Sequence, residues 1–194
     1  MSEAPLFGAF APRRGIAEAA EEGLPDDLVE VGAILQAYGV RGQIKVAPHA
    51  QGGDALLAAR TWWLDIRGQT LRVGPVRARL HSGTVAAGWP GCEDRDAAEA
   101  LKGARVRVRR SDFPALPEGE YYWVDLIGLT VSNPQGDVLG TVADLIDNGA
   151  HSVLRVTDGE AGEAVERLIP FVGAYVLEVD VPARRLLVDW QRDY

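Results

Sequence analysis

Basic side chains at alternating positions are the first feature of this sequence that could do chemistry. Arginine alternates with valine or alanine in two places, giving Arg105, Arg107 and Arg109 in one run and Arg77 and Arg79 in another. Successive side chains of a β-strand point to opposite faces, so each set of arginines would share one face of its strand. If the two strands are neighbours, the arginines form a basic surface for an RNA backbone, and the alternative is a solvated strand face.

A glycine-flanked arginine indicates a sharp reversal of the chain. Gly39 and Gly42 lie on either side of Arg41 in GVRGQIKV (39–46). Glycine adopts positive φ without steric cost, so we expect a tight turn between two strands. Arg41 at its tip would bind phosphate or pack on a partner, or the segment is a plain turn. Its spacing is not GxGxxG and no helix follows, which excludes a dinucleotide-binding loop.

Three consecutive aromatic residues and an acid form a second cluster. They are Tyr121, Tyr122, Trp123 and Asp125 in EYYWVDLIGL (120–129). Three consecutive aromatic residues cannot all face one core, and in an extended segment at least one ring must point outward. Tyr and Trp bury a large area with few rotatable bonds, which favours them as interface anchors. Two interpretations remain: core packing alone, or a mixed role in which Asp125 caps a turn or pairs with a basic partner.

The patterns that catalysis or metal binding would need are missing. Cys92 is the single cysteine, which excludes a zinc site built from several thiolates, and the three histidines are far apart in the sequence. Asp137, Asp144 and Asp147 do not have the spacing of a calcium-binding loop. We therefore expect no metal, no cofactor and no enzymatic activity.

Two groups of short strands would position these residues. Period-two alternation predicts strands at 28–35, 43–49, 62–66, 71–80, 84–89 and 104–110, then at 127–131, 138–147, 152–156, 177–181 and 185–190. One short helix interrupts them at 93–103, with Asp94 or Asp96 as its N-cap and Gly103 as its stop. An acidic, mobile loop is expected at 157–166. The fold class is therefore all-β, with two small antiparallel β-barrels.

The chain is predicted to have four parts: a flexible tail (1–27), a barrel (28–110), a linker (111–120) and a second barrel (121–194). The linker, SDFPALPEGE, contains two prolines and a glycine, which break regular structure. Residues 28–112 carry thirteen Lys and Arg against eight acids, whereas residues 113–194 carry five Arg against fourteen acids. The basic part suits phosphates and the acidic part suits a basic protein.

Targeting and membrane segments are not evident in the sequence. No apolar stretch follows Arg13 and Arg14 in the manner of a secretory signal, and no apolar run is long enough for a membrane-spanning helix. A single thiol suits the cytoplasm. We expect a cytoplasmic monomer without a membrane partner.

Four stretches in order along residues 29–190 together carry a family resemblance. They are VGAILQAYGVRGQIKV (31–46), EDRDAAEALKGARVRV (93–108), GEYYWVDLIGLTVSNPQGDVLGTVADLIDNGAHSVLRV (119–156) and LIPFVGAYVLEVDVPARRLLVDW (168–190). In this order they resemble the bacterial ribosome maturation factors of the RimM family. Two features depart from that pattern: residues 1–27 extend the chain, and Gln36, Ala37 and Tyr38 stand where other members often carry a Pro-His pair.

The resemblance implies a translation-factor-like N-terminal barrel and a C-terminal PRC barrel in a non-enzymatic assembly factor. Such proteins bind the head of the immature small ribosomal subunit and help 16S rRNA to mature. The family's PRC barrel is implicated in docking on a basic head protein, the nineteenth of the small-subunit series, and the paired tyrosines, here Tyr121 and Tyr122, matter for subunit binding.

We therefore expect protein contacts from Tyr121, Tyr122, Trp123 and Asp125, and rRNA contacts from Arg41, Arg77, Arg79, Arg105, Arg107 and Arg109. Two other classes stay open. An rRNA-processing enzyme would need clustered carboxylates with a divalent metal, or a His/Lys pair. A PRC-barrel module could instead serve a non-ribosomal partner.

Overall fold

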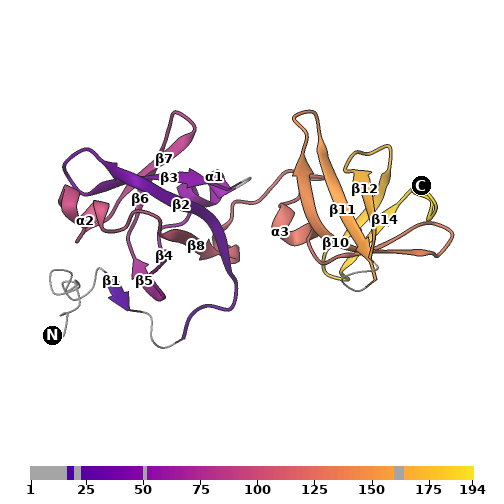
Figure 1. The fold of residues 1–194 in the computed structure, drawn as a ribbon, viewed down its shortest axis with the longest axis horizontal. Helices are drawn as coiled ribbons and strands as arrows, with labels where there is room; N and C mark the ends of the chain where they lie inside the picture. The colour runs from indigo at the N-terminus through magenta and orange to yellow at the C-terminus, as the bar shows by residue number, and fades with distance from the viewer. Residues whose placement is uncertain (1–16, 20–22, 50–51, 160–163) are drawn as a thin grey trace. The chain divides into compact units, whose positions relative to one another are not determined.

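The computed structural model of the protein describes residues 17–19, 23–49, 52–159 and 164–194. The chain forms two compact units, 1–115 and 116–194, each of which has its own core (Figure 1). Most of the predicted flexible tail (1–16 and 20–22) lies outside the described residues, as do residues 160–163 of the predicted acidic loop. Within the tail, Ala17–Ala19 forms strand β1, which pairs antiparallel with β5.

The first unit contains one eight-stranded sheet in the order β1-β5-β4-β8-β2-β3-β7-β6. After β1, its strands are β2 (Leu28–Tyr38), β3 (Gln43–Pro48), β4 (Trp62–Ile66), β5 (Gln69–Val73), β6 (Arg77–His81), β7 (Thr84–Gly88) and β8 (Arg105–Arg109). Every pairing in it is antiparallel. The predicted strand at 71–80 is in fact two, because Pro75 has no N–H for the ladder and the chain turns there.

Alternation along these strands builds the core of the first unit. Ile44 and Val46 of β3 are fully buried, and so are Val106 and Val108 of β8, while the residues between them face away. Trp62 is the largest fully buried side chain. Burial of such side chains contributes about 1.5–3 kcal/mol each, which makes this face the main source of stability.

Three short helical segments accompany these strands: α1 (Gly52–Ala58), α2 (Arg95–Glu99) and the 3-10 turn η1 (Arg110–Asp112). The sequence did not predict α1, which buries Ala55 and Leu56 against the sheet. The predicted helix at 93–103 is shorter than expected. Of its two candidate caps the structure has Asp94, whose carboxylate accepts a hydrogen bond from the Ala97 N–H at 2.8 Å.

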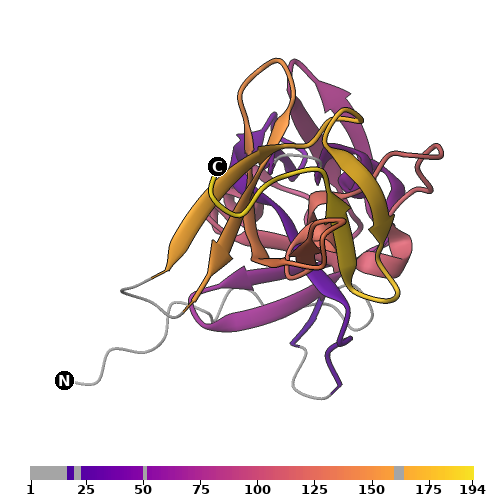
Figure 2. The same ribbon diagram turned by 90° about the vertical axis from the view of Figure 1, so that its right-hand side faces the viewer.

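The second unit contains a six-stranded sheet in the order β12-β11-β10-β9-β14-β13. Its elements are α3 (Trp123–Leu126), β9 (Thr130–Ser132), β10 (Val138–Asp147), β11 (Ser152–Asp158), β12 (Val165–Pro170), β13 (Val176–Asp180) and β14 (Arg185–Val188). Figure 2 shows the β10–β11 hairpin (orange) from a second side. Strand β12 begins at Val165, inside the predicted loop of 157–166, so that loop is shorter than expected.

Two details differ from the expectation of closed antiparallel barrels, although the two-module β architecture is confirmed. Strands β9 and β14 pair in parallel, with Val131 opposite Leu186. The strand orders of both sheets are also open: among the described strands, no pairing joins β1 to β6 or β12 to β13. Each sheet instead packs one side against an apolar cluster. Continuous pairing from one edge strand to the other holds the sheet together.

Candidate functional site

The arginines of β8 share one face, but each of them meets a carboxylate. Arg105 and Arg109 are exposed and Arg107 is half-buried. The ion pairs are Arg105 to Glu30 at 3.6 Å, Arg107 to Asp65 at 2.7 Å and Arg109 to Asp27 at 2.9 Å. A paired carboxylate cancels much of the field that a guanidinium would project towards phosphate. This face is therefore less basic than its sequence suggests.

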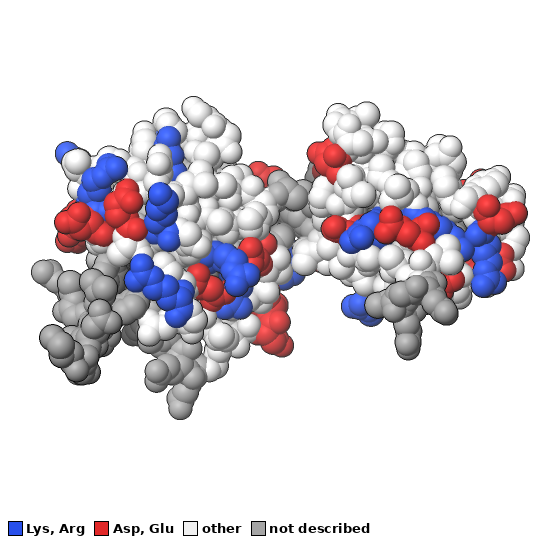
Figure 3. Space-filling view, viewed as in Figure 1, with Lys and Arg blue, Asp and Glu red and all other residues white. Residues whose placement is uncertain are grey.

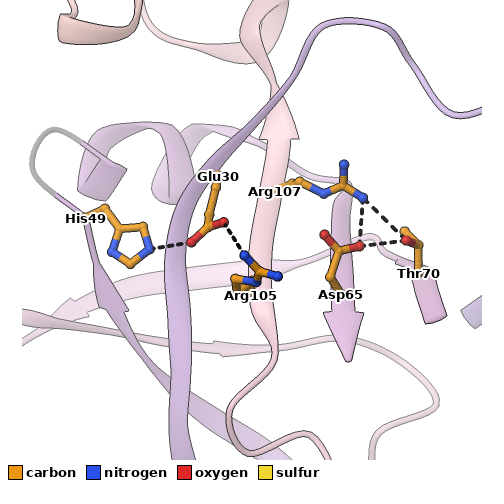
Figure 4. A network of polar contacts seen from close by, with 6 residues as sticks. All are labelled: Glu30, His49, Asp65, Thr70, Arg105 and Arg107. Atoms are coloured by element: carbon orange, nitrogen blue, oxygen red, sulfur yellow. Dashed lines mark hydrogen bonds and ion pairs between the residues drawn. The ribbon is translucent and has the colours of Figure 1, made fainter. Parts of the chain in front are cut away.

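Figure 4 shows how two of these ion pairs, Arg105–Glu30 and Arg107–Asp65, are joined to further polar groups. The Asp65 carboxylate also accepts a hydrogen bond from Thr70 Oγ1 at 2.6 Å, and Arg107 Nη2 donates to the same hydroxyl at 3.3 Å. His49 Nε2 lies 2.9 Å from Glu30 Oε1. A shallow depression lined in part by Lys102, Arg105 and Arg107 adjoins the network.

The second set of arginines lies on a different part of the sheet. Arg77 and Arg79 are exposed on β6, at the edge, and three strands separate β6 from β8. The sequence interpretation of one basic surface required these strands to be neighbours, and the strand order contradicts it. The two sets are therefore separate candidates for RNA contact.

Arg41 is exposed in the turn between β2 and β3, and both of its flanking glycines have positive φ, 69° at Gly39 and 77° at Gly42. The turn packs on the segment before α2. A Cβ at residue 42 would lie 2.1 Å from the carbonyl oxygen of Cys92, and Arg95 donates a hydrogen bond to the Gly39 carbonyl at 3.1 Å. The glycines thus hold this turn against the body of the first unit.

One cluster near β6 was not singled out in the sequence. Lys45 Nζ lies 5.1 Å from the centre of the Tyr38 ring, Arg79 Cζ lies 5.8 Å from it, and the His81 ring lies 5.1 Å away with a tilt of 48°. Four residues from three strands meet here, so no local sequence pattern predicts the whole cluster. Alternation in QIKV indicates one member, because it places Lys45 on the opposite strand face from the buried Ile44 and Val46.

The aromatic segment is extended at Tyr122 and helical from Trp123. Tyr121 and Tyr122 precede α3, a single helical turn that begins at Trp123, and Tyr122 is 4% exposed. Tyr121 and Trp123 are half-buried and pack on the core of the second unit, where the Tyr121 ring meets Phe171 edge-on with ring centres 6.3 Å apart. Asp125 is half-buried within α3. The rings are thus divided between one buried and two partly accessible positions.

The second unit has an excess of acids over bases. Ion pairs in this unit join Arg155 to Asp144 at 3.7 Å and to Glu166 at 3.5 Å, and Arg185 to Asp180 at 3.2 Å. In Figure 3, Lys and Arg atoms lie beside Asp and Glu atoms on the visible face of each unit. With fourteen acids against five arginines, residues 113–194 carry a large excess of negative charge. This surface would attract a basic protein.

The described residues assemble no metal-binding cluster, and their one cysteine is buried. No set of three or more His, Cys, Asp or Glu side chains there could hold a metal ion. Cys92 is buried, and burial together with the charge of Asp94 raises the pKa of its thiol to about 11. Among those same residues, no helix has the length and apolar content that crossing a membrane demands.

Comparison with known proteins finds matches along nearly the whole chain. Residues 29–113 match the RimM N-terminal domain and residues 123–194 match the RimM PRC barrel domain. A ribosome maturation factor RimM of Burkholderia multivorans is 53% identical over 97% of this chain and 93% of its own, and that of Cupriavidus taiwanensis is 53% identical over 89% and 90%.

A crystal structure of a 16S ribosomal RNA processing protein RimM from Pseudomonas aeruginosa is 35% identical, covers 87% of this chain and 100% of its own, and has a TM-score of 0.43. The family models cover both units in the expected order and together span most of the chain. The matches also cover 93% and 90% of the two relatives' own lengths. The chain therefore belongs to the RimM family of ribosome maturation factors.

Proposed function

We propose that this protein is a cytoplasmic, non-enzymatic assembly factor that binds the immature small ribosomal subunit and promotes 16S rRNA processing. The observation that carries the proposal is the match of both units, in order, to one family whose members are ribosome maturation factors. Because the first unit matches as well as the PRC barrel, a PRC module serving an unrelated partner is disfavoured. Membership of the RimM family, a family of non-catalytic maturation factors, also disfavours an rRNA-processing enzyme.

The partner of the second unit is proposed to be a basic protein of the subunit head, the nineteenth of the small-subunit series. Three properties of this unit support it: its acidic excess, the half-buried rings of Tyr121 and Trp123, and Asp125 beside them. Partly accessible aromatic rings supply contact area, and surrounding acids speed encounter with a basic surface and orient it. Tyr122 supports this surface from inside, because it is buried.

The first unit is proposed to contact 16S rRNA next to that protein, and the whole chain to act as a monomer. Its net positive charge, with thirteen Lys and Arg against eight acids in 28–112, supports this assignment. Arg41, Arg77 and Arg79 are exposed, whereas Arg105, Arg107 and Arg109 are ion-paired. The former three are therefore the better candidates for phosphate contact.

A pull-down on purified immature small subunits and on the isolated head protein tests the proposal. The intact chain should retain both targets, and Tyr121→Ala should lose affinity while Tyr121→Phe keeps most of it. Tyr122→Phe is the matched variant at the buried ring, since truncation of this ring to alanine would destabilise the unit. Circular dichroism and urea unfolding establish that each variant is folded.

Failure of the intact chain to bind either target would contradict the proposal. Equal binding by Tyr121→Ala would move the protein interface away from this ring. Incubation with precursor rRNA and magnesium should give no cleavage, and specific cleavage by the purified chain would restore the enzyme class.

A further inference from the structure

The outward face of β2, β3, β7 and β6, four adjacent strands of the first unit, combines an aromatic ring with cations that form no ion pair to any residue that the structure describes. In the register, Ala86 of β7 lies directly opposite Lys45 of β3 on one side and Arg79 of β6 on the other. Directly paired residues share a sheet face, so these three point to the same side. Ile44, Val46, Val85 and Ala87 occupy the alternate positions and belong to the core, so the side with Lys45 and Arg79 faces out.

Tyr38 stands at the centre of this face. Lys45 Nζ is 5.1 Å and Arg79 Cζ is 5.8 Å from the centre of its ring, and the His81 ring is packed against it at 5.1 Å. A cation over an aromatic ring is held in place by the ring quadrupole and keeps its full charge. Tyr38 therefore positions two cations without neutralising them. We call Tyr38, Lys45, Arg77, Arg79 and His81 the Tyr38 face.

Around Tyr38, the outward positions that the structure describes carry no carboxylate. They are Gln36 and Tyr38 at the end of β2; Gln43, Lys45 and Ala47 of β3; Thr84, Ala86 and Gly88 of β7; and Arg77, Arg79 and His81 of β6. Glu30 lies at the other end of β2, where it pairs with Arg105 and His49. Three cations of this face, Lys45, Arg77 and Arg79, form no ion pair within 4.0 Å to any described residue. In contrast, each arginine of β8 forms one: Arg105, Arg107 and Arg109. Cations that lack a carboxylate partner are free to exchange their counterions for phosphates.

The floor of the Tyr38 face is small. Gly88 lies opposite Arg77, and Ala86, with 2% of its surface exposed, lies between Lys45 and Arg79. Because Ala86 and Gly88 are small, they do not block access to the long side chains beside them. A backbone phosphate can therefore approach the charged ends of Lys45, Arg77 and Arg79. Gln43, beside Gly88, adds an amide donor on the same side.

We propose that the Tyr38 face is the RNA contact of the first unit and binds backbone phosphates through Lys45, Arg79 and Arg77, with Tyr38 as the residue that positions the first two. This inference rests on the proposed function and gives it a location. It assigns to the ion-paired arginines of β8 a structural role, and it adds Tyr38, Lys45 and His81 to the arginines that the sequence indicated.

Two double variants of equal charge test the proposal in the full-length chain. Lys45→Gln/Arg79→Gln removes two unpaired cations, and Arg105→Gln/Arg109→Gln removes two ion-paired ones. Affinity for a protein-free 16S rRNA transcript and for immature subunits is measured by fluorescence anisotropy and by sedimentation from 50 to 200 mM salt. The first pair should weaken rRNA binding about tenfold and lower the salt slope by about 1.5 to 2, and the second should change affinity less than about twofold.

Variants at the ring test its positioning role. Tyr38→Phe keeps the ring and should bind like the intact chain, whereas Tyr38→Leu should weaken binding about two- to fivefold through loss of the cation–ring contacts. A merely structural ring would give equal affinities for both folded variants. Urea unfolding of each variant separates a loss of binding from a loss of folding.

The outcomes separate this inference from the function on which it rests. Equal losses from the two double variants would reduce the effect to bulk charge, and a loss confined to the Arg105/Arg109 pair would place the contact at the depression beside β8. Either result would overturn the Tyr38 face while the intact chain still binds subunits. If the intact chain binds neither rRNA nor subunits, the proposed function fails and this inference fails with it.

Discussion

Arg167 donates a hydrogen bond from Nη1 to the carbonyl oxygen of Leu139 at 2.9 Å, inside the second unit. Its side chain is 4% exposed, and Nη2 donates to the carbonyl oxygen of Arg192 at 2.9 Å, near the end of the chain. The Asp158 carboxylate lies 4.0 Å from Nη1. A buried guanidinium thus ties β12 to β10 and to the C-terminal segment mainly through backbone oxygens.

Arg167→Met is expected to lower the free energy of unfolding by about 2 kcal/mol, because it leaves a buried carbonyl oxygen without a donor. Urea unfolding followed by tryptophan fluorescence measures the change. Arg185→Met is the matched control, since that side chain is 67% exposed and should matter by less than about 0.5 kcal/mol. Equal effects of the two substitutions would show that the buried hydrogen bonds contribute little.

The turn after β2 gives a prediction that distinguishes two similar glycines. Gly39 and Gly42 both have positive φ, so alanine at either position costs about 1 kcal/mol in backbone strain. A Cβ at 39 has no atom within 4 Å, whereas one at 42 would lie 2.1 Å from the Cys92 oxygen. Gly42→Ala should therefore destabilise the protein by at least about 2 kcal/mol more than Gly39→Ala. Thermal unfolding of both variants decides it, and similar midpoints would contradict the close approach.

The sequence allowed strand faces to be predicted better than strand neighbours. The alternation of arginine with Val106 and Val108 correctly separates the outward side of β8 from the core. That Asp65 meets Arg107 could not be foreseen, since 42 residues separate them and the contact depends on which strands pair. The same reason explains why Arg77 and Arg105 are not on neighbouring strands, and why Tyr38 and Arg79 meet.

Short helices escaped the sequence patterns for local reasons. Segment α1 begins with two glycines, which disfavour helix, and tertiary burial of Ala55 and Leu56 outweighs that cost. The turn α3 has no capping side chain at Tyr122, and its run of aromatic residues suits a strand equally well. In contrast, Asp94 carries a helix signal of its own as the N-cap of α2, and that element was predictable.

Cys92 is expected to be unreactive in the folded protein. Burial, with the added effect of the Asp94 charge, raises its pKa from 9.0 to about 11, so at pH 8 the thiolate is about a hundredfold scarcer than for an ordinary thiol. Ellman's reagent should therefore label the native chain very slowly at pH 8 and label it at once in urea. Rapid labelling of the native chain, at the rate seen in urea, would contradict the burial of this residue.

The pair of Arg107 and Asp65 tests whether the arginines of β8 serve the fold. Both side chains are about three-quarters buried and their charged atoms lie 2.7 Å apart, whereas Arg105 and Glu30 are more exposed and 3.6 Å apart. A double-mutant cycle with Arg107→Met and Asp65→Asn should give a coupling energy of about 1 kcal/mol, because partial burial weakens solvent screening.

The matched cycle with Arg105→Met and Glu30→Gln should give less than about 0.5 kcal/mol, as exposed pairs do. Urea unfolding of the intact chain and the six variants supplies both values. A coupling near zero for Arg107 and Asp65 would mean that the pair adds no stability. The guanidinium of Arg107 could then turn to phosphate at little cost, and β8 would again compete with the Tyr38 face for the RNA.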